Sequence, residues 1–165
     1  MLTLEPITLT SPEMPACIAL DVPPHKKEED YVLAAAYTLA YAYTFNKRGT
    51  PYECRAIYAD GQIVGLIAYI YYTDNPVFKE TCYRIRPILV DKSHQDKGYE
   101  LEVLRQLITE IETLPHGNAT AIFASYDPEE TDCASRFAAA GFTVTDLNWG
   151  EEDPDDNDII VRRAL

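Results

Sequence analysis

A short polar stretch, Gln95 to Glu100, carries residue types suited to binding an anion. Gly98 allows the main chain to turn sharply or to approach a ligand closely, and Lys97 beside it adds a positive charge. If a helix begins after this glycine, its first N–H groups have no partner within the helix and attract negative charge. The stretch therefore predicts a phosphate site. A plain strand-to-helix connection, in which the glycine serves only the turn, is the alternative.

The residues on either side predict the elements that would position this turn. Residues 85–90 (IRPILV) are mostly apolar and predict a buried strand, and residues 91–98 predict a charged turn. Residues 99–112 predict a helix, because apolar side chains recur there at helical spacing. These side chains are Leu101, Leu104, Leu107, Ile108 and Ile111.

The rest of the chain predicts one α/β (α+β) domain over residues 1–165, with a mixed sheet of about six to seven strands and helices on both faces. Asp60-Gly61 between two apolar runs predicts a hairpin, and Gly141 predicts the end of a helix. The other expected strands are residues 2–9, 54–59, 63–72, 120–125, 142–146 and 159–165, and the other expected helices are residues 12–20, 25–45 and 129–140.

The composition narrows the classes of partner. A net charge of −13 argues against a general nucleic-acid binder and against attraction to anionic membranes, and it is compatible with a cationic ligand. The uncharged residues 31–45 are too few and too rich in alanine and tyrosine to span a membrane, so we expect a buried helix there. Tyr37 and Tyr41 share one face of this helix, which we expect to pack in the core; hydroxyls that line a cleft are the alternative.

Cysteine and histidine give no metal site. The four cysteines and the three histidines lie at no spacing typical of metal ligands. Scattered single cysteines fit reduced thiols, and the N-terminal residues show no secretory signal. We therefore expect a cytoplasmic protein without a bound metal.

The order of elements, with a Gln-x-x-Gly turn after the fourth strand, resembles the GNAT family of N-acetyltransferases over nearly the whole chain. The family signature is Gln/Arg-x-x-Gly-x-Gly/Ala, and this chain has Gln95-Asp96-Lys97-Gly98-Tyr99-Glu100. The segment VDKSHQDKGYE is similar to the diamine or polyamine acetyltransferase subgroup, and SYDPEE…RFAAAGF is similar to the family's second landmark.

The resemblance implies acetyl-CoA as co-substrate. The fourth and fifth strands would splay apart, and pantetheine would pair with backbone groups near Ile88 and Val90. The acceptor, a primary amine of a small molecule, would attack the thioester directly. The implied cofactor residues are Ile88, Val90, Gln95, Asp96, Lys97, Gly98, Tyr99 and Glu100, with Glu130 and Phe137 at the positions of the second landmark.

Three positions depart from the family pattern. Glu100 stands where glycine or alanine is expected, Glu130 where asparagine is expected, and Phe137 where a tyrosine would protonate the leaving thiolate. The catalytic acid and base therefore stay unassigned, with Tyr126 and Glu28 as candidates.

Two arginines leave it undecided whether the acceptor carries an anionic group. Arg84 and Arg86 are two residues apart in the expected fourth strand and therefore share a face. If that face lines the cleft, the acceptor carries a carboxylate or phosphate; if they pair with acidic residues across the sheet, they say nothing about the substrate. Acidic candidates near an amine entrance are Glu28, Glu29, Asp30 and residues 151–158.

Three functions follow from these patterns. The first is an acetyl-CoA-dependent N-acetyltransferase. The second is a GNAT-fold module that binds CoA or another protein without catalysis, which the three departures favour. The third is an acidic module for a basic partner, which rests only on net charge. The oligomeric state is open, and a homodimer is one candidate.

Overall fold

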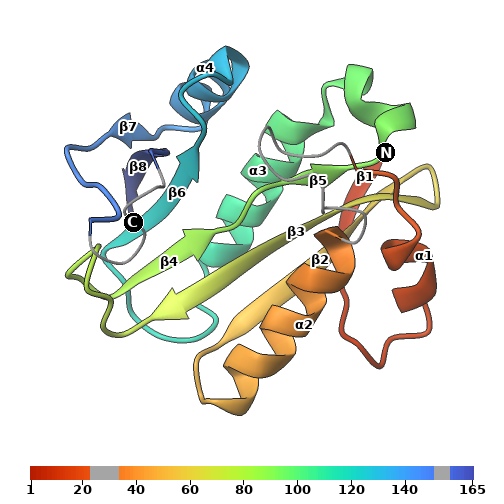
Figure 1. Cartoon of the computed structure of the whole chain (residues 1–165), viewed down its shortest axis with the longest axis horizontal. Helices are drawn as coiled ribbons and strands as arrows, with labels where there is room; N and C mark the ends of the chain where they lie inside the picture. The colour runs from red at the N-terminus through yellow and green to blue at the C-terminus, as the bar shows by residue number, and fades with distance from the viewer. Residues whose placement is uncertain (23–33, 151–156) are drawn as a thin grey trace.

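The computed structural model describes residues 1–22, 34–150 and 157–165. It forms an eight-stranded sheet with helices packed on it (Figure 1). The strands are β1 (Leu2–Pro6), β2 (Tyr52–Ala59), β3 (Gln62–Tyr72), β4 (Cys82–Ile85), β5 (Leu89–Val90), β6 (Ala121–Tyr126), β7 (Thr143–Val144) and β8 (Ile159–Ala164). The helices are α1 (Met14–Ile18), α2 (Ala34–Lys47), α3 (Tyr99–Ile111), α4 (Thr131–Ala139) and the 3-10 helix η2 (Lys92–Lys97).

The strand order is β1-β2-β3-β4-β6-β8-β7, and β5 pairs with β3 beside β4. Strands β4 and β6 pair in parallel, whereas the other pairs are antiparallel. Asp60 and Gly61 form the predicted hairpin between β2 and β3, with φ angles of 50° and 82°. Positive φ at both central residues matches the right-handed twist of the strands.

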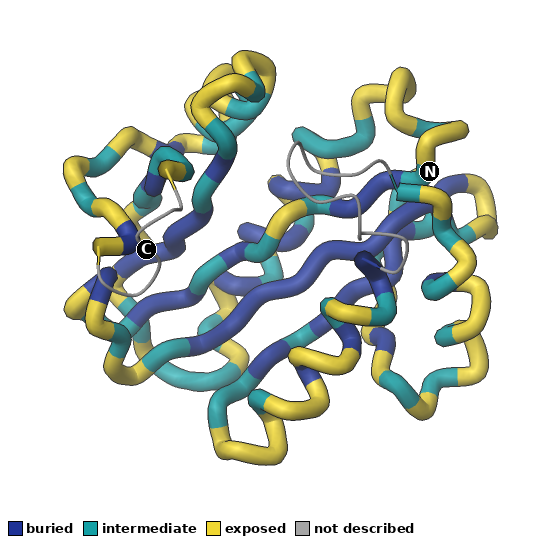
Figure 2. The backbone as a smooth tube through the Cα atoms, viewed as in Figure 1, coloured by how far each residue is buried: buried dark blue, intermediate teal, exposed yellow. Residues whose placement is uncertain are grey.

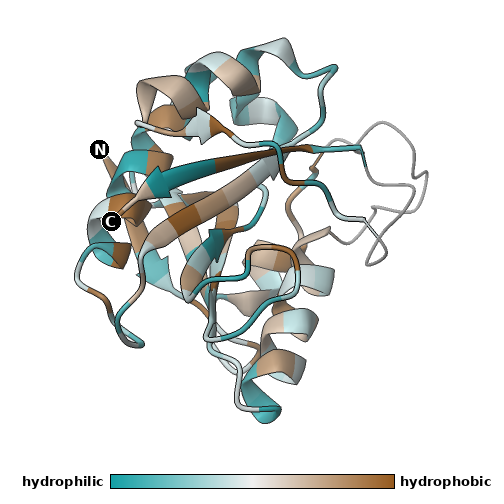
Figure 3. Ribbon diagram, turned by 90° about the vertical axis from the view of Figure 1, so that its left-hand side faces the viewer, coloured by the Kyte–Doolittle hydropathy of each residue, from teal (hydrophilic) through white to brown (hydrophobic). Residues whose placement is uncertain are grey.

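Each face of the sheet is covered by its own helices. Helices α1 and α2 pack on one face through a core that includes Cys17, Leu39 and Leu66. Helix α3 packs on the other face over Ile67 and Ile122, and Phe137 of α4 joins this second core. Figure 2 shows the central strands buried between them, and the turned view in Figure 3 shows helices on both sides of the sheet.

The prediction of one continuous strand over residues 85–90 is wrong. Ile85 pairs with Tyr69, but Leu89 pairs with Leu66, so the segment between them holds one residue more than the strand opposite. This is a β-bulge, and Pro87 within it has no N–H to give to a ladder. The break turns the expected strand into β4 and β5 and raises the number of strands to eight.

The bulge also separates two neighbouring strands, as the resemblance implied. Pairing of β4 with β6 ends at Arg84 and Phe123. Beyond this point β5 stays with β3, while β6 continues along β8. The sheet therefore opens between β5 and the second half of β6.

Helix α2 differs from its prediction. It buries Ala34, Ala35, Leu39 and Ala42, but Tyr37 and Tyr41 are 57% and 42% exposed, so the tyrosine face does not pack in the core. The first residues of the predicted helix 25–45 lie outside the described residues. No helix in the described parts of the chain is long and apolar enough to cross a membrane.

Candidate functional site

A pocket of about 440 Å³ lies where the sheet opens. Segments far apart in the sequence line it: the loop after α1, strand β5, the turn before α3, and the start of α4. The lining residues are Val22, Ile88, Leu89, Val90, Gln95, Glu100, Glu129, Glu130, Thr131, Asp132, Cys133 and Arg136. Two helix N-termini, those of α3 and α4, therefore converge on the same space.

The turn before α3 is ordered by its own side chains. Asp91 accepts hydrogen bonds from Ser93 N at 3.0 Å and from Asp21 N at 2.9 Å, which fixes the start of η2. The Gln95 side chain donates to the carbonyl of Val90 at 3.3 Å and ties the turn to β5. The glutamine of the predicted motif thus joins two walls of the pocket.

Gly98 ends this turn in the left-handed conformation. Its φ is 68°, it is the N-cap of α3, and no side chain caps that N-terminus among the described residues. A Cβ added at Gly98 would have no atom within 4 Å. The glycine is therefore required by its backbone angle, and the space beside the first N–H groups of α3 stays open to a ligand.

The start of α4 adds a polar cluster to the opposite wall. The Cys133 thiol donates to Glu130 Oε2 at 3.1 Å, and Arg136 Nη1 lies 3.6 Å from the same sulfur. Burial, followed by the hydrogen bond and the charge of Glu130, raises the pKa of the Cys133 thiol to about 12. The thiol is therefore protonated at neutral pH and is a poor nucleophile.

Carboxylates dominate the charge of the pocket. Glu100, Glu129, Glu130 and Asp132 line it, against Arg136 as the basic side chain of the lining. The main chain of the α3 N-terminus attracts an anion, while the nearby carboxylates oppose one. Binding of a phosphate here would depend on backbone N–H groups more than on side-chain charge.

The structure brings together half of the predicted cofactor residues. Ile88, Val90, Gln95, Glu100 and Glu130 line the pocket. Asp96, Lys97, Gly98 and Tyr99 form the turn between Gln95 and Glu100 without lining the pocket themselves. Tyr99 instead stacks on His94, with ring centroids 6.4 Å apart.

The structure brings no described candidate for the catalytic acid or base into the pocket lining. Phe137, a predicted cofactor residue at the position of the tyrosine acid, packs against the core outside the pocket lining and stacks on Tyr126 with a centroid distance of 5.8 Å. Tyr126 is buried and does not line the pocket. Glu28, like Glu29, Asp30 and most of the acidic loop, lies outside the described residues.

Sequence reasoning missed several lining residues, chiefly Cys133 and Arg136 of α4 and Val22 after α1. For α4 a signal was present, because Glu130, Cys133 and Arg136 follow one another at three-residue spacing and so share a helix face. The sequence held no such signal for Val22, because only the tertiary fold brings the loop after α1 to β5.

The remaining cysteines are buried thiols with raised pKa values, and the described residues form no cluster of metal ligands. The described cysteines are all free thiols. Burial raises the pKa of Cys17 to about 11 and those of Cys54 and Cys82 to about 12. No group of three potential metal ligands occurs among the described residues.

Comparison with known proteins agrees with this geometry. The sequence pattern of the Acetyltransferase (GNAT) family matches residues 16–142. No curated protein is similar enough in sequence to match the chain.

Solved structures with the same fold share little sequence with this protein. A GNAT acetyltransferase from Elizabethkingia anophelis with acetyl-CoA bound has 15% identity and a TM-score of 0.66, with 99% of this chain and 98% of that chain covered. A Bacillus subtilis acetyltransferase in complex with CoA has 16% identity and a TM-score of 0.65, with 100% and 99% covered.

A third similar structure is a chimera of the Vibrio cholerae spermidine N-acetyltransferase SpeG with hSSAT. It has 14% identity and a TM-score of 0.70, and the match covers 99% of this chain and 95% of that chain. Identities this low show the fold and not the acceptor. Because the family pattern covers residues 16–142, which is most of the chain, this protein belongs to the Acetyltransferase (GNAT) family.

Proposed function

We propose that the protein is an acetyl-CoA-dependent N-acetyltransferase that acts on a primary amine of a small molecule. The observation that carries the proposal is the pocket at the opening of the sheet, where β5 and the N-terminus of α3 meet. Two similar structures hold acetyl-CoA or CoA, which supports the same co-substrate here.

Backbone groups of the pocket are suited to bind this co-substrate. The first N–H groups of α3, after Gly98, would hold the pyrophosphate. One edge of β5 pairs with β3, and its other edge faces the opening, where the backbone of Ile88 and Val90 would bind the amides of pantetheine. The bound group supplies an activated acetyl thioester.

Direct attack by the acceptor amine fits the protein better than an acyl-enzyme. The described cysteines have raised pKa values, so none is a thiolate at neutral pH. The amine must lose a proton and the departing thiolate must gain one. Tyr126 is the candidate for the second role that the sequence offers, but it is buried outside the pocket lining.

The proposal is tested by binding and by turnover. Millimolar acetyl-CoA should raise the melting temperature, and a panel of primary amines should release free CoA thiol. A Gly98→Val variant should lose both effects, because a branched side chain would fill the space at the α3 N-terminus and oppose the backbone angle.

The matched control is Gly61→Val. Gly61 has a φ of 82° and equally open surroundings, but it lies in the β2–β3 hairpin. It should cost similar stability while acetyl-CoA still binds. If wild-type protein shows no thermal shift with acetyl-CoA, the proposed co-substrate is wrong.

A non-catalytic CoA-binding module is the second candidate. The phenylalanine at position 137 favours it, because this ring cannot donate a proton. Binding of acetyl-CoA without thiol release for any amine would support this candidate. Turnover that Gly98→Val abolishes would exclude it.

Replacing Glu100 by glutamine should strengthen acetyl-CoA binding by about fivefold to tenfold at low ionic strength, which is roughly 1 kcal/mol. Glu100 lines the pocket in the first turn of α3, so its charge opposes phosphate groups held there. The dissociation constant measured by calorimetry at two salt concentrations checks this, and the gain should shrink in high salt.

The control for this prediction is Glu102→Gln. Glu102 lies in the same first turn but is exposed and outside the pocket lining. An equal gain in both variants would mean that overall charge, and not the position of Glu100, limits binding.

A further inference from the structure

Most arginines in the strands of this protein are neutralised by carboxylates. Arg55 Nη1 lies 3.1 Å from Glu53, and its guanidinium also binds Glu110. Arg162 Nε lies 2.9 Å from Glu80. Arg163 Nη2 lies 2.8 Å from Glu112. With 27 acidic residues in the chain, carboxylate partners are abundant.

Arg84 and Arg86 differ from these arginines. Neither forms an ion pair with a carboxylate among the residues that the structure describes. The guanidinium of Arg84 stacks on Trp149, 4.2 Å from the ring centroid, and also interacts with the Tyr72 hydroxyl. Arg86 interacts with the hydroxyl of Tyr52. Both side chains are held by neutral groups.

The two arginines share one face of the sheet. Arg84 is paired with Ile70 of β3 and Phe123 of β6. Arg86 N donates to the carbonyl of Ala68 at 2.8 Å, which continues the same register. Ile70 and Ala68 belong to the core under α1 and α2. The arginines thus lie on the face opposite α3 and α4, at the point where β4 and β6 separate.

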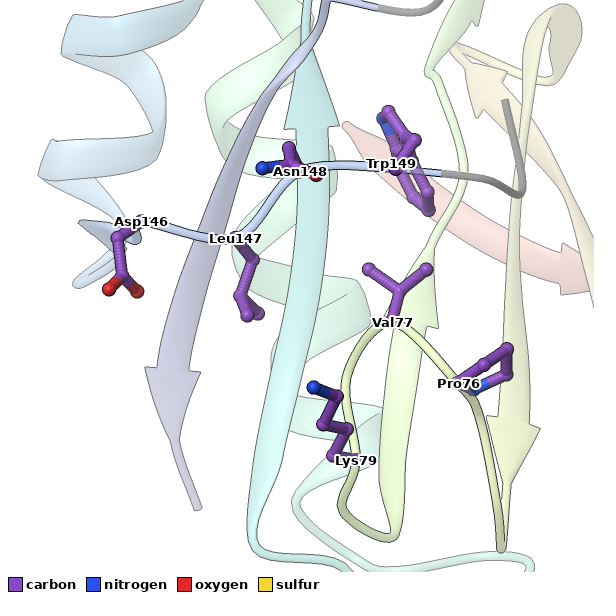
Figure 4. A pocket seen from close by; sticks show the side chains of 8 residues that line it. Pro76, Val77, Lys79, Asp146, Leu147, Asn148 and Trp149 are labelled. Carbon is purple, nitrogen blue, oxygen red and sulfur yellow. The ribbon is translucent and has the colours of Figure 1, made fainter. Parts of the chain in front are cut away.

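Trp149 adds a hydrogen-bond donor that has no acceptor among the described residues. It is 7% exposed, and its Nε1 has no hydrogen-bond partner in the described structure. Phe78 supports it edge-on at 5.9 Å and stacks in turn on Phe123. Figure 4 shows Trp149 on the loop after β7, above Val77, where both line a second pocket of about 480 Å³.

We infer that Arg84 and Arg86 bind an anionic group, a carboxylate or a phosphate, on the acceptor amine. Two half-buried guanidinium groups two residues apart repel each other until an anion joins them. Their planar N–H donors match the oxygens of either group. Arg84 holds the last β4–β6 pair before the sheet opens, on the face opposite α3.

Arg84 stays positively charged although it is half-buried beside Arg86. Burial, followed by the neighbouring charge of Arg86, lowers the pKa of Arg84 to about 10, so the group is still protonated at neutral pH. An acceptor with only amine groups would place positive charge beside two guanidinium groups. An amino acid or an amino phosphate suits the site better, and this inference rests on the proposed function.

A first test uses no acetyl-CoA. Trp149 is the single tryptophan of the chain, so its fluorescence reports on binding beside Arg84. Titration with inorganic phosphate and with acetate, at constant ionic strength against chloride, should give a saturable change with at least one of them. Arg86→Met should weaken that response at least tenfold, and Arg86→Lys should restore part of it. Arg48→Met, which removes an exposed charge at the end of α2, should leave it unchanged.

A second test measures acceptor preference by thiol release. An amino acid is compared with its amide, and phosphoethanolamine with ethanolamine, which separates a carboxylate from a phosphate. The anionic member of one pair should have a kcat/KM at least tenfold higher, and Arg86→Met should remove that preference while the thermal shift with acetyl-CoA persists.

The two hypotheses fail separately. A fluorescence response that is absent, or that Arg86→Met leaves unchanged, would overturn the anion site. So would equal kcat/KM values within both pairs. Failure of acetyl-CoA to stabilise the wild-type protein would overturn the proposed function alone, because the fluorescence titration still tests the arginines.

Discussion

Replacing Gly65 by alanine should lower the free energy of unfolding by about 2–3 kcal/mol and weaken acetyl-CoA binding more than tenfold. Gly65 lies in β3 opposite Val90 of β5. A Cβ there would lie 2.3 Å from the Leu89 carbonyl oxygen and 2.9 Å from Ile57 Cδ1. The carbonyl belongs to the backbone, so β5 must move away from β3 and distort the wall of the pocket. Denaturant unfolding and calorimetry with acetyl-CoA measure the two effects.

The double variant Gly65→Ala/Ile57→Val identifies the clash that matters. The valine lacks Cδ1, so the contact with Ile57 disappears while the contact with the Leu89 carbonyl remains. We expect no recovery of acetyl-CoA binding. Wild-type affinity in the single variant would show that β5 does not form the binding wall.

Replacing Glu110 by alanine should lower the free energy of unfolding by about 3 kcal/mol. Arg55 is only 9% exposed. Its Nε donates to Glu110 Oε2 at 3.0 Å, and the Tyr69 hydroxyl donates to Glu110 Oε1 at 2.9 Å. Without Glu110, the buried guanidinium keeps Glu53 as its ion-pair partner among the described residues, and a buried hydroxyl loses its acceptor. The melting temperature should fall by about 6–12 °C for a domain of this size.

Glu112→Ala is the matched control for this variant. Glu112 follows α3 directly and pairs with Arg163, but its side chain is 44% exposed. An exposed pair contributes less than about 1 kcal/mol, so the loss should be much smaller. Affinity for acetyl-CoA should change in neither variant, because both glutamates lie at the end of α3 remote from Gly98. Equal losses of stability would contradict a special role for the buried pair.

Much of the fold follows from local sequence pattern. The helical spacing of Leu104, Leu107 and Ile111 predicted α3, and these side chains are buried. Asp60-Gly61 predicted the hairpin, and Gly98 predicted the turn that α3 follows. In each case a few neighbouring residues decide the conformation, because periodic burial and positive φ angles are local constraints.

The errors arose where partners distant in sequence decide the outcome. The apolar run around Ile85 and Leu89 reads as one strand, yet its two ends pair with β3 one residue out of register, which divides it into two strands. The tyrosines of α2 have the spacing of a core face, but Tyr37 and Tyr41 are exposed because smaller side chains such as Ala42 face the sheet.

By itself the sequence determined the turn at Gly98 and the common face of Arg84 and Arg86, because glycine geometry and strand alternation act over a few residues. Only the tertiary structure decided that the sheet opens beside this turn and that α4 closes the pocket with carboxylates. It also decided that Arg84 meets Trp149, 65 positions along the chain, and pairs with no carboxylate of the described residues. Alternation sets which way a side chain points, whereas its partner depends on how distant segments pack.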